Sequence, residues 1–293
     1  MEKALNYIDI FAGCGGLSTG LFNAGWHGLF AVEKNADAFS TLKFNLIDTV
    51  PHFVWPEWLS TEAHDINELI SKNDDNLKAL RGHVTLVAGG PPCQGFSMAG
   101  KRNANDQRNK LVESYIQFIK LVAPQVIIFE NVHGFTVNFK DKKGAKQYST
   151  YVEQALTEEG YQVAHSIIDM SHFGIPQNRK RFILVAMKGH DPKRVFAVLA
   201  ENRAAFCKEK GIMCTTSVRD AISDLEKSCG TVPSPDTKGF NAGIYGAIQS
   251  GYQKLMRQKL STDTRVVNSH RFVNHRADTV KLHEDLLRTA PRG

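Results

Sequence analysis

The chain of 293 residues carries 42% apolar and 23% charged side chains, with a formal net charge of +6 at pH 7. This length and composition allow a substantial buried core, which excludes a disordered, collagen-like or small disulfide-stapled protein. No apolar run approaches the roughly 18 residues of a membrane-spanning helix, and no signal-peptide segment is visible. The five cysteines are widely spaced and form no Cys-x-x-Cys pair. We therefore expect a protein of the cytoplasm with no membrane contact and no bound metal.

The excess of basic residues, with an isoelectric point near 9.0, favours a polyanionic partner such as nucleic acid. Many basic proteins bind no nucleic acid, so the charge alone leaves the partner open.

Five short runs rich in β-branched and aromatic residues predict the strands of a sheet. They are residues 7–11, 29–32, 84–88, 126–129 and 182–186. Helical patterns lie between some of them, at residues 111–122 and 148–159, and the second ends before a glycine. This alternation predicts an α/β fold with a doubly wound, mostly parallel sheet of the Rossmann type and helices on both faces.

The pattern weakens after residue 186. Residues 191–228 have a helical composition of mixed polarity, residues 229–242 are expected to form a loop, and no further strand is indicated. We predict one domain over residues 1–225, followed by an incomplete extension over residues 226–293.

A glycine-rich turn follows the first predicted strand, at residues 12–16. Glycines allow a tight turn and a close approach to a ligand, and the helix that follows offers free N–H groups. The second strand ends at Glu33, which lies 20 residues after Gly13 (33 − 13 = 20). An acid at this spacing typically binds ribose hydroxyls, so the combination indicates a cofactor that contains adenosine.

Cys93 lies in a loop after the third predicted strand, within Gly89-Gly-Pro-Pro-Cys-Gln-Gly-Phe-Ser97. The two prolines stiffen the backbone before the thiol, and the basic residues at 101, 102, 108 and 110 favour a thiolate. A lone cysteine is usually a small buried apolar residue. The position at a strand end favours a nucleophile instead.

Glu130 ends the fourth strand, where it would face the same crevice as Cys93. A nucleophile and a carboxylic acid on neighbouring strand ends can act together as nucleophile and general acid. Arg179 and Arg181 alternate with Gln177 and would share one face, where they could orient a carboxylate or grip a phosphate. A solvated charge and a basic edge strand remain the alternatives.

These motifs occur together in one order: Phe11-Ala-Gly-Cys-Gly-Gly16, Pro92-Cys-Gln94, Glu130-Asn-Val132 and Gln177-x-Arg-x-Arg181. Over residues 7 to about 225 the chain resembles the DNA (cytosine-5)-methyltransferase family. The resemblance implies S-adenosyl-L-methionine as cofactor, S-adenosyl-L-homocysteine as product and a flipped cytosine in double-stranded DNA as substrate. It also implies that Cys93 attacks C6 of the base and that Glu130 contacts N3 and the exocyclic amine.

The same resemblance assigns further site residues. Arg179 and Arg181 match arginines that contact the target base region and the DNA backbone, and residues 94–110 match a loop that closes over the substrate. The implied cofactor-binding residues are Phe11, Gly13, Gly16, Leu17, Glu33, Asp65, Ile66, Gly90, Pro92 and Leu111.

The resemblance also implies segments that this sequence lacks. Family members usually continue with a target-recognition region, an Arg-Glu motif and a final Gly-Asn-Ser-type motif. Residues 270–293 resemble the segment that leads into the recognition region. We expect one subunit of a split enzyme that needs a complementary subunit, with a truncated gene product or an expression fragment as alternatives.

The expected function is methylation of cytosine C5 in DNA, within a restriction–modification system. A tRNA cytosine-5 methyltransferase and a non-catalytic subunit are the alternatives, although retention of Cys93 and Glu130 argues against the latter. A nicotinamide dehydrogenase would not explain the Pro-Cys-Gln motif. The sequence identifies neither the recognised DNA site nor the base that removes the C5 proton.

Overall fold

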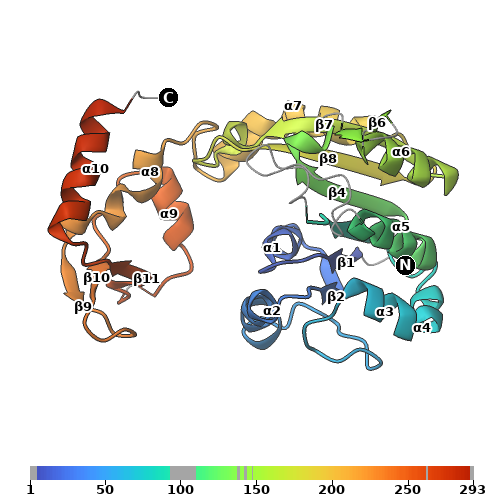
Figure 1. The fold of residues 1–293 in the computed structure, drawn as a ribbon, viewed down its shortest axis with the longest axis horizontal. Helices are drawn as coiled ribbons and strands as arrows, with labels where there is room; N and C mark the ends of the chain where they lie inside the picture. Colours follow the sequence, from blue (N-terminus) through green and yellow to red (C-terminus); the bar gives the residue numbers. More distant parts are fainter. Residues whose placement is uncertain are drawn as a thin grey trace. The chain divides into compact units, whose positions relative to one another are not determined.

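The structure is a computed structural model that describes residues 5–92, 110–136, 139–141, 144–146, 148–261 and 263–290. Its contacts divide the chain into two compact units (Figure 1). The first unit comprises Met1–Asp169 with Arg179–Glu201, and the second comprises Met170–Asn178 with Asn202–Gly293.

The first unit is built on a six-stranded sheet with the strand order β2-β1-β3-β4-β8-β7. Strands β1 to β4 of this sheet run parallel, whereas β8 is antiparallel to both β4 and β7. The strands are β1 (Asn6–Ile10), β2 (His27–Val32), β3 (Leu86–Gly89), β4 (Val126–Val132), β7 (Gln162–Asp169) and β8 (Lys180–Met187). A separate two-stranded ribbon pairs β5 (Phe139–Asp141) with β6 (Gly144–Lys146).

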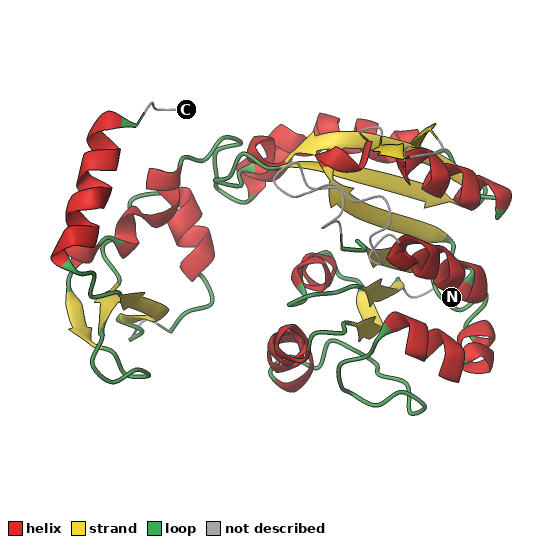
Figure 2. Ribbon diagram, viewed as in Figure 1, coloured by secondary structure: helices red, strands yellow, loops and turns green. Residues whose placement is uncertain are grey.

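Helices cover both faces of this sheet (Figure 2). Successive side chains of a strand point to opposite faces, so Ile8 and Ile10 belong to one apolar cluster and Tyr7 belongs to another. The second cluster is covered by α1 (Gly16–Asn23) and α2 (Ala36–Lys43). The first is covered by α3 (Ile66–Lys72), α4 (Asp74–Ala79), α5 (Lys110–Val122) and α6 (Tyr148–Glu158).

The predicted α/β architecture is confirmed, and each of the five predicted strands is present with ends shifted by at most three residues. The predicted helices at 111–122 and 148–159 correspond to α5 and α6. Strand β7 was not predicted. It lies at the edge of the sheet, where its side chains are half-buried or exposed, so its sequence lacks an apolar run.

The second unit contains a three-stranded antiparallel sheet, so the expectation of no further strand is wrong. Its strands are short and carry polar side chains between apolar ones, which explains the weak signal. They are β9 (Thr231–Pro233), β10 (Asn241–Ile244) and β11 (Val266–Phe272). The stretch 191–228 is α-helical only in α7 (Lys193–Glu209), which begins in the first unit, and in α8 (Val218–Ile222).

A buried polar network joins α8 and its following turn to α9 (Gly251–Arg257) in this second unit. Arg257 forms an ion pair with the buried Asp224 and stacks over the ring of Tyr245, with 4.2 Å between guanidinium carbon and ring centroid. Gln253 Nε2 donates a hydrogen bond of 2.9 Å to Ser223 Oγ. By contrast, α10 (Ala277–Thr289) contains no buried residue.

The boundary expected near residue 225 remains a prediction. It separates the predicted domain from the predicted extension, whereas the two compact units are defined by the contacts between residues. Among the helices that the structure describes, none is long and apolar enough to cross a membrane.

Asp9 is a buried carboxyl group on strand β1, which lies between β2 and β3, with 1% of its surface exposed. Ser18 Oγ on α1 donates a hydrogen bond of 2.6 Å to Asp9 Oδ2, while Oδ1 has no hydrogen-bond partner among the described residues. Burial raises the pKa of Asp9 to about 7, with the nearby charge of Glu33 acting in the same direction. The folded chain therefore holds a proton that the unfolded chain loses near pH 4.

Replacement of Asp9 by asparagine should change how stability depends on pH. A raised pKa in the folded state stabilises fully below about pH 4, and this stabilisation declines as the pH rises to about 7. Asparagine has no such proton, so the stability of Asp9→Asn relative to wild type should increase between pH 5 and pH 8, on the order of 2 kcal/mol. Thermal unfolding at both pH values measures this, with the exposed Asp75→Asn as control. A difference independent of pH would contradict the prediction.

Candidate functional site

The site lies at the edge of the sheet where the parallel strands β1 to β4 end. The register places Arg181, at the start of the antiparallel β8, opposite Val132 at the end of β4. The segments after β1, β2 and β3, the end of β4 and the start of β8 therefore meet at one edge, where open α/β sheets bind their ligands.

The chain turns sharply after β1. Phe11 and Gly13 both have left-handed backbone conformations, with φ of 60° and 56°. For Gly13 this conformation carries no steric cost, because it has no Cβ. The Ala12 N–H donates to Val32 O at 3.0 Å, which ties the turn to the end of β2.

Glu33 joins the ends of β1 and β2 through its carboxylate. Its Oε2 accepts the Gly13 N–H at 2.8 Å, and its Oε1 accepts the Asn35 N–H at 2.7 Å. Two charge-assisted hydrogen bonds to backbone fix both the turn and this side chain. Glu33 is thus a preorganised acceptor at the strand end, and its contact with a ribose remains a prediction.

Asp65 lies on a second segment that runs beside Glu33, because the His64 N–H donates to Glu33 O at 2.8 Å. The Asp65 carboxylate caps helix α3 by accepting the Asn67 N–H at 2.8 Å, and its other oxygen lies 2.8 Å from Lys34 Nζ. The hydrogen bond from Lys34 is the main reason that the pKa of Asp65 lies below its usual range. Asp65 therefore stays ionised near neutral pH.

These segments enclose a cavity of about 270 Å³. It combines apolar walls with two carboxylates, which suits a ligand that carries both a flat ring and hydroxyl or amino groups. Its lining is Phe11, Val32, Glu33, Lys34, His64, Asp65, Ile66, Gly90, Pro92 and Leu111.

Seven residues that the sequence predicts for cofactor binding line this cavity: Phe11, Glu33, Asp65, Ile66, Gly90, Pro92 and Leu111. Gly13 is not among the lining residues, but its N–H donates a hydrogen bond to the carboxylate of Glu33, which does line the cavity. Gly16 and Leu17 form the start of α1 and are not among the lining residues, so their contact with a cofactor remains a prediction.

Three lining residues were not predicted: Val32, Lys34 and His64. Each is the immediate chain neighbour of a predicted acid, either Glu33 or Asp65. Proximity in sequence to those acids was the available signal.

Gly90 connects the cavity to Glu130. It lines the cavity, and a Cβ built on it would lie 2.5 Å from Glu130 O and 2.7 Å from Glu130 Oε2. Only glycine allows β3 and β4 to approach so closely at this point. The Glu130 carboxylate therefore lies directly behind the cavity wall.

Glu130 also contacts the start of β8, where Arg181 Nε lies 2.7 Å from Glu130 Oε1. Burial raises the pKa of Glu130, and the charge of Arg179 acts in the opposite direction. A carboxyl group with a raised pKa, oriented by an arginine, is suited to hold or donate a proton. The structure thus brings Glu130 and the two predicted arginines together.

Asn131, the next residue, fastens the segment that follows β3. It is 2% exposed, and its Nδ2 donates to Pro91 O at 3.2 Å while its Oδ1 accepts the Val132 N–H at 2.9 Å. Cys93 and residues 94–109 lie outside the described residues, and Lys110 begins α5. Described structure therefore extends to Pro92, immediately before the predicted nucleophile.

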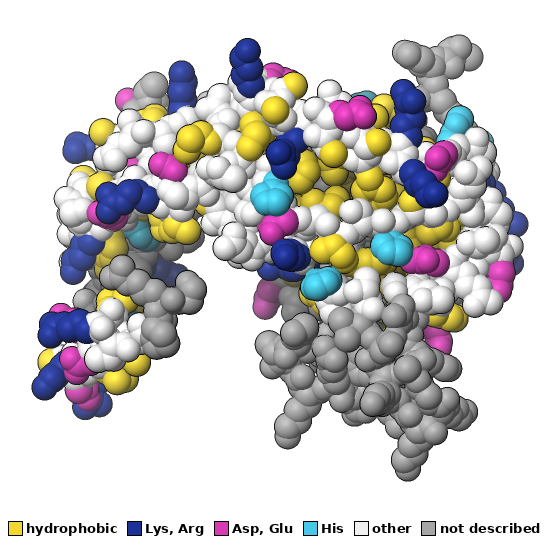
Figure 3. All heavy atoms as spheres, turned by 90° about the horizontal axis from the view of Figure 1, so that it is seen from above, with side chains coloured by type: hydrophobic (Ala, Val, Ile, Leu, Met, Phe, Trp, Pro, Cys, Tyr) yellow, Lys and Arg dark blue, Asp and Glu magenta, His cyan; other side chains and the backbone are white. Residues whose placement is uncertain are grey.

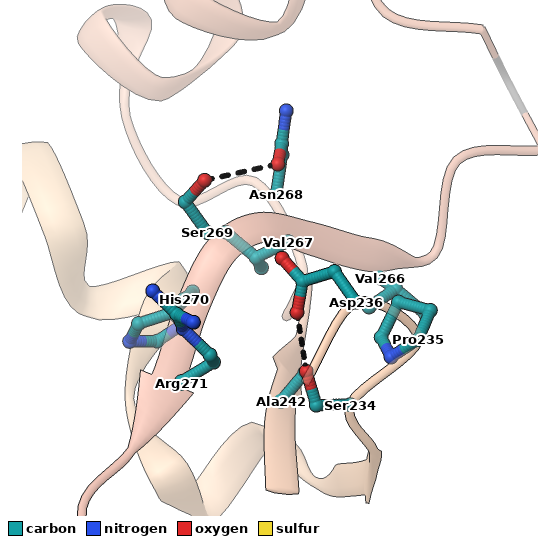
Figure 4. A pocket seen from close by; sticks show the side chains of 10 residues that line it. All are labelled: Ser234, Pro235, Asp236, Ala242, Val266, Val267, Asn268, Ser269, His270 and Arg271. Atoms are coloured by element: carbon teal, nitrogen blue, oxygen red, sulfur yellow. Dashed lines mark hydrogen bonds between the residues drawn. The ribbon is translucent and has the colours of Figure 1, made fainter. Parts of the chain in front are cut away.

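A second cavity, of about 210 Å³, lies in the second unit beside β11 (Figure 4). Its charged groups are already engaged locally: Asp236 accepts from Ser234 Oγ at 2.6 Å, and Arg271 donates to Thr237 Oγ1 at 2.6 Å. On the face drawn in Figure 3, Lys and Arg side chains are interspersed with Asp and Glu. The net positive charge is therefore not gathered in one patch on that face.

Comparison with known families and proteins identifies the relatives of this chain. The family model for C-5 cytosine-specific DNA methylase matches residues 5–286. The chain is 32% identical over 225 residues to the type II methyltransferase M.DdeI of Desulfomicrobium norvegicum, across 75% of this chain and 48% of that protein. It is 34% identical over 261 residues to M.AgeI of Thalassovita gelatinovora, across 85% of this chain and 57% of that protein. The chain thus spans about half the length of these curated relatives.

Among solved structures, a putative DNA modification methyltransferase encoded within a prophage of E. coli superposes with a TM-score of 0.56. The match is 23% identical and covers 86% of this chain and 64% of that one. It supports the Rossmann-like fold.

Substitution of Gly90 by alanine should disturb both the cavity and Glu130, because the added Cβ would collide with the backbone oxygen of Glu130. We expect a loss of stability of about 1–3 kcal/mol, as for overpacking in a core, together with weaker ligand binding in the cavity. Gly20→Ala is the control, because Gly20 lies in α1 with no atom within 4 Å of its Cβ position. Thermal unfolding and ligand titration measure the two effects. An unchanged melting temperature would mean that β3 and β4 are less tightly apposed than the structure indicates.

Proposed function

We propose that this chain, which belongs to the C-5 cytosine-specific DNA methylase family, transfers a methyl group from S-adenosyl-L-methionine to C5 of cytosine in double-stranded DNA. The observation that carries the proposal is the connection at Gly90. One glycine separates a cavity suited to an adenosine cofactor from the half-buried Glu130 carboxyl group, whose raised pKa suits it to activate a base.

The residues of the cavity fit the proposed cofactor. Glu33, held by two backbone N–H groups, presents carboxylate lone pairs to ribose hydroxyls. Asp65 offers an ionised acceptor to the exocyclic amine of adenine, and Ile66 and Leu111 add apolar lining to the same cavity. When bound, S-adenosyl-L-methionine supplies an electrophilic methyl group on a sulfonium.

Cytosine C5 is a poor nucleophile because the ring is aromatic and electron-poor. In the proposed mechanism the Cys93 thiolate forms a bond to C6, which breaks the aromaticity and raises the electron density at C5. Glu130 in its protonated form donates to N3 and stabilises the negative charge that develops in the ring. The raised pKa of Glu130 supports this role, and its contact with Arg181 fixes its direction.

The remaining steps return the enzyme to its starting state. Once C5 carries the methyl group, a base not yet identified removes the C5 proton, the C6–S bond breaks and the N3 proton returns to Glu130, which restores the aromatic ring, the Cys93 thiolate and the protonated Glu130. These atoms are stacked in duplex DNA, so the base must be extruded before the thiolate can reach C6. Arg179 and Arg181 are proposed to contact the extruded base region and the backbone phosphates.

We place this activity in a cytoplasmic restriction–modification system, as the names of the type II relatives suggest. A complementary polypeptide that carries sequence recognition is part of the same proposal. The exposed helix α10 is consistent with such a contact, since its Leu287 is 81% exposed and Leu282 57%. Direct recognition of a DNA sequence requires side chains in the grooves, in addition to phosphate contacts.

Loss of the Glu33 carboxylate should weaken cofactor binding. Glu33→Ala removes the acceptor for ribose and releases the turn after β1, so we expect a loss of about 1–3 kcal/mol in binding free energy for S-adenosyl-L-homocysteine. Calorimetry with the purified chain measures it, and the exposed Glu57→Ala serves as control. Equal affinity of Glu33→Ala and wild type would place the ribose elsewhere.

The nucleophile can be tested with DNA that contains 5-fluorocytosine, because fluorine at C5 blocks the elimination that frees the thiolate. Wild-type chain, supplemented with any complementary polypeptide that it needs, should form a covalent adduct visible by denaturing electrophoresis. Cys93→Ser should form none, and Glu130→Gln should form it more slowly, by about 10²-fold or more, since glutamine cannot donate the same proton. The same assay with fluorinated tRNA tests the alternative substrate. An adduct with Cys93→Ser would remove Cys93 from the mechanism.

A further inference from the structure

Lys34 lines the proposed cofactor cavity and is its only lysine or arginine among the described lining residues. It directly follows Glu33 after β2, and its ammonium lies 2.8 Å from Asp65 Oδ2 at the start of α3. The two segments that form this wall are therefore joined twice: by the His64–Glu33 backbone hydrogen bond and by this ion pair.

Folding stability does not explain the ion pair. The Lys34 side chain is 78% exposed, and pairs with so exposed a lysine contribute little to stability because water and salt screen them. Its partner differs in this respect, since the Asp65 side chain is only 20% exposed and forms part of the cavity wall. The pair therefore acts mainly on the orientation and the protonation of the Asp65 carboxylate.

Lys34 and the backbone N–H groups of Asn67 and Glu68 all favour the ionised form of Asp65. The Asn67 N–H holds Asp65 Oδ1, and Lys34 holds Asp65 Oδ2, so the carboxylate is fixed at both oxygens. Without Lys34, one oxygen loses its partner and the carboxyl group takes up a proton more readily. A protonated or rotated carboxyl group is a poorer acceptor for an amino group of a ligand.

From this geometry we infer that Lys34 is a positioning residue for the cofactor. Its ammonium fixes the direction and the charge of the Asp65 carboxylate, which is the proposed acceptor for the adenine amine. The inference rests on the proposed function for the identity of the ligand. Lys34 itself need not touch the cofactor.

Lys34 also affects how cofactor binding depends on pH. Lys34 holds the pKa of Asp65 low, so in wild type the acceptor is lost only as the pH falls through this depressed value. Without Lys34, Asp65 should take up its proton, and so be lost as an acceptor, already at higher pH. The other titratable groups around the pair are Glu68 on α3, His64 beside Asp65 in the chain, and Glu33 in the same cavity. They are present in every variant compared.

The test is calorimetric titration of the full chain with S-adenosyl-L-homocysteine from about pH 8 to about pH 4, a range that spans the ordinary carboxyl pKa. Lys34→Met should weaken binding about two- to fivefold at pH 8 and move the acid limb of the affinity profile to higher pH. Lys34→Arg should restore the wild-type profile. Lys72→Met is the matched control, because Lys72 forms an exposed ion pair with Glu68, at 2.9 Å, outside the cavity lining.

A double-mutant cycle separates this role from a structural one. Since Lys34 is inferred to act through Asp65, adding Lys34→Met to Asp65→Asn should cause no further loss of affinity. Additive losses, or an unchanged acid limb in Lys34→Met, would overturn the inference while leaving the cofactor site intact. A wild-type chain that binds neither S-adenosyl-L-homocysteine nor S-adenosyl-L-methionine would instead overturn the proposed function, and this inference with it.

Discussion

The close approach of backbone at the carboxyl ends of β1, β3 and β4 is the constraint on which the site depends. A Cβ on Gly89 would lie 2.0 Å from Ile10 O, and a Cβ on Gly90 would lie 2.5 Å from Glu130 O. Two consecutive glycines thus allow β3 to fit between its neighbours just where the strands end. This fit places the cavity on one side of Gly90 and the Glu130 carboxyl group on the other. Larger side chains at these positions would separate the two halves of the proposed reaction.

Much of this arrangement could be predicted because its signals are local. Apolar runs specify the buried parallel strands, and parallel strands bring their carboxyl ends to one edge. Glu33 and Glu130 were therefore assigned to one site from sequence alone, although 97 residues separate them (130 − 33 = 97). Asp65 is different, because it follows no strand. Its assignment came from the family resemblance, and the structure explains it through the hydrogen bond from His64 to Glu33.

Other features depend on long-range pairing and left no local pattern. Strand β7 is stabilised by its pairing with β8, which extends along its whole length. Because β7 lies at the edge of the sheet, it can carry polar residues. Strand β11 pairs with β10 across 21 intervening residues, counted between Ile244 and Val266 (266 − 244 − 1 = 21). Lys34 does follow Glu33 directly in the sequence, but its role depends on a distant partner. Its partner Asp65 is 31 residues away (65 − 34 = 31), and an exposed lysine after a strand is ordinarily a solvated charge.

The carboxyl groups of this edge have opposite environments, and the contrast argues for their separate roles. Lys34 lowers the pKa of Asp65, which keeps it an acceptor, whereas burial raises the pKa of Glu130, which favours the protonated form. Where neighbouring titratable groups are driven apart in this way, one environment suits ligand binding and the other suits proton transfer. In the proposed reaction, cofactor binding needs an ionised acceptor, and activation of N3 needs a group that can donate a proton. One end of the sheet holds both environments because the ammonium of Lys34 lies on the side of β2 and α3, while the half-buried Glu130 lies on β4, between β3 and β8.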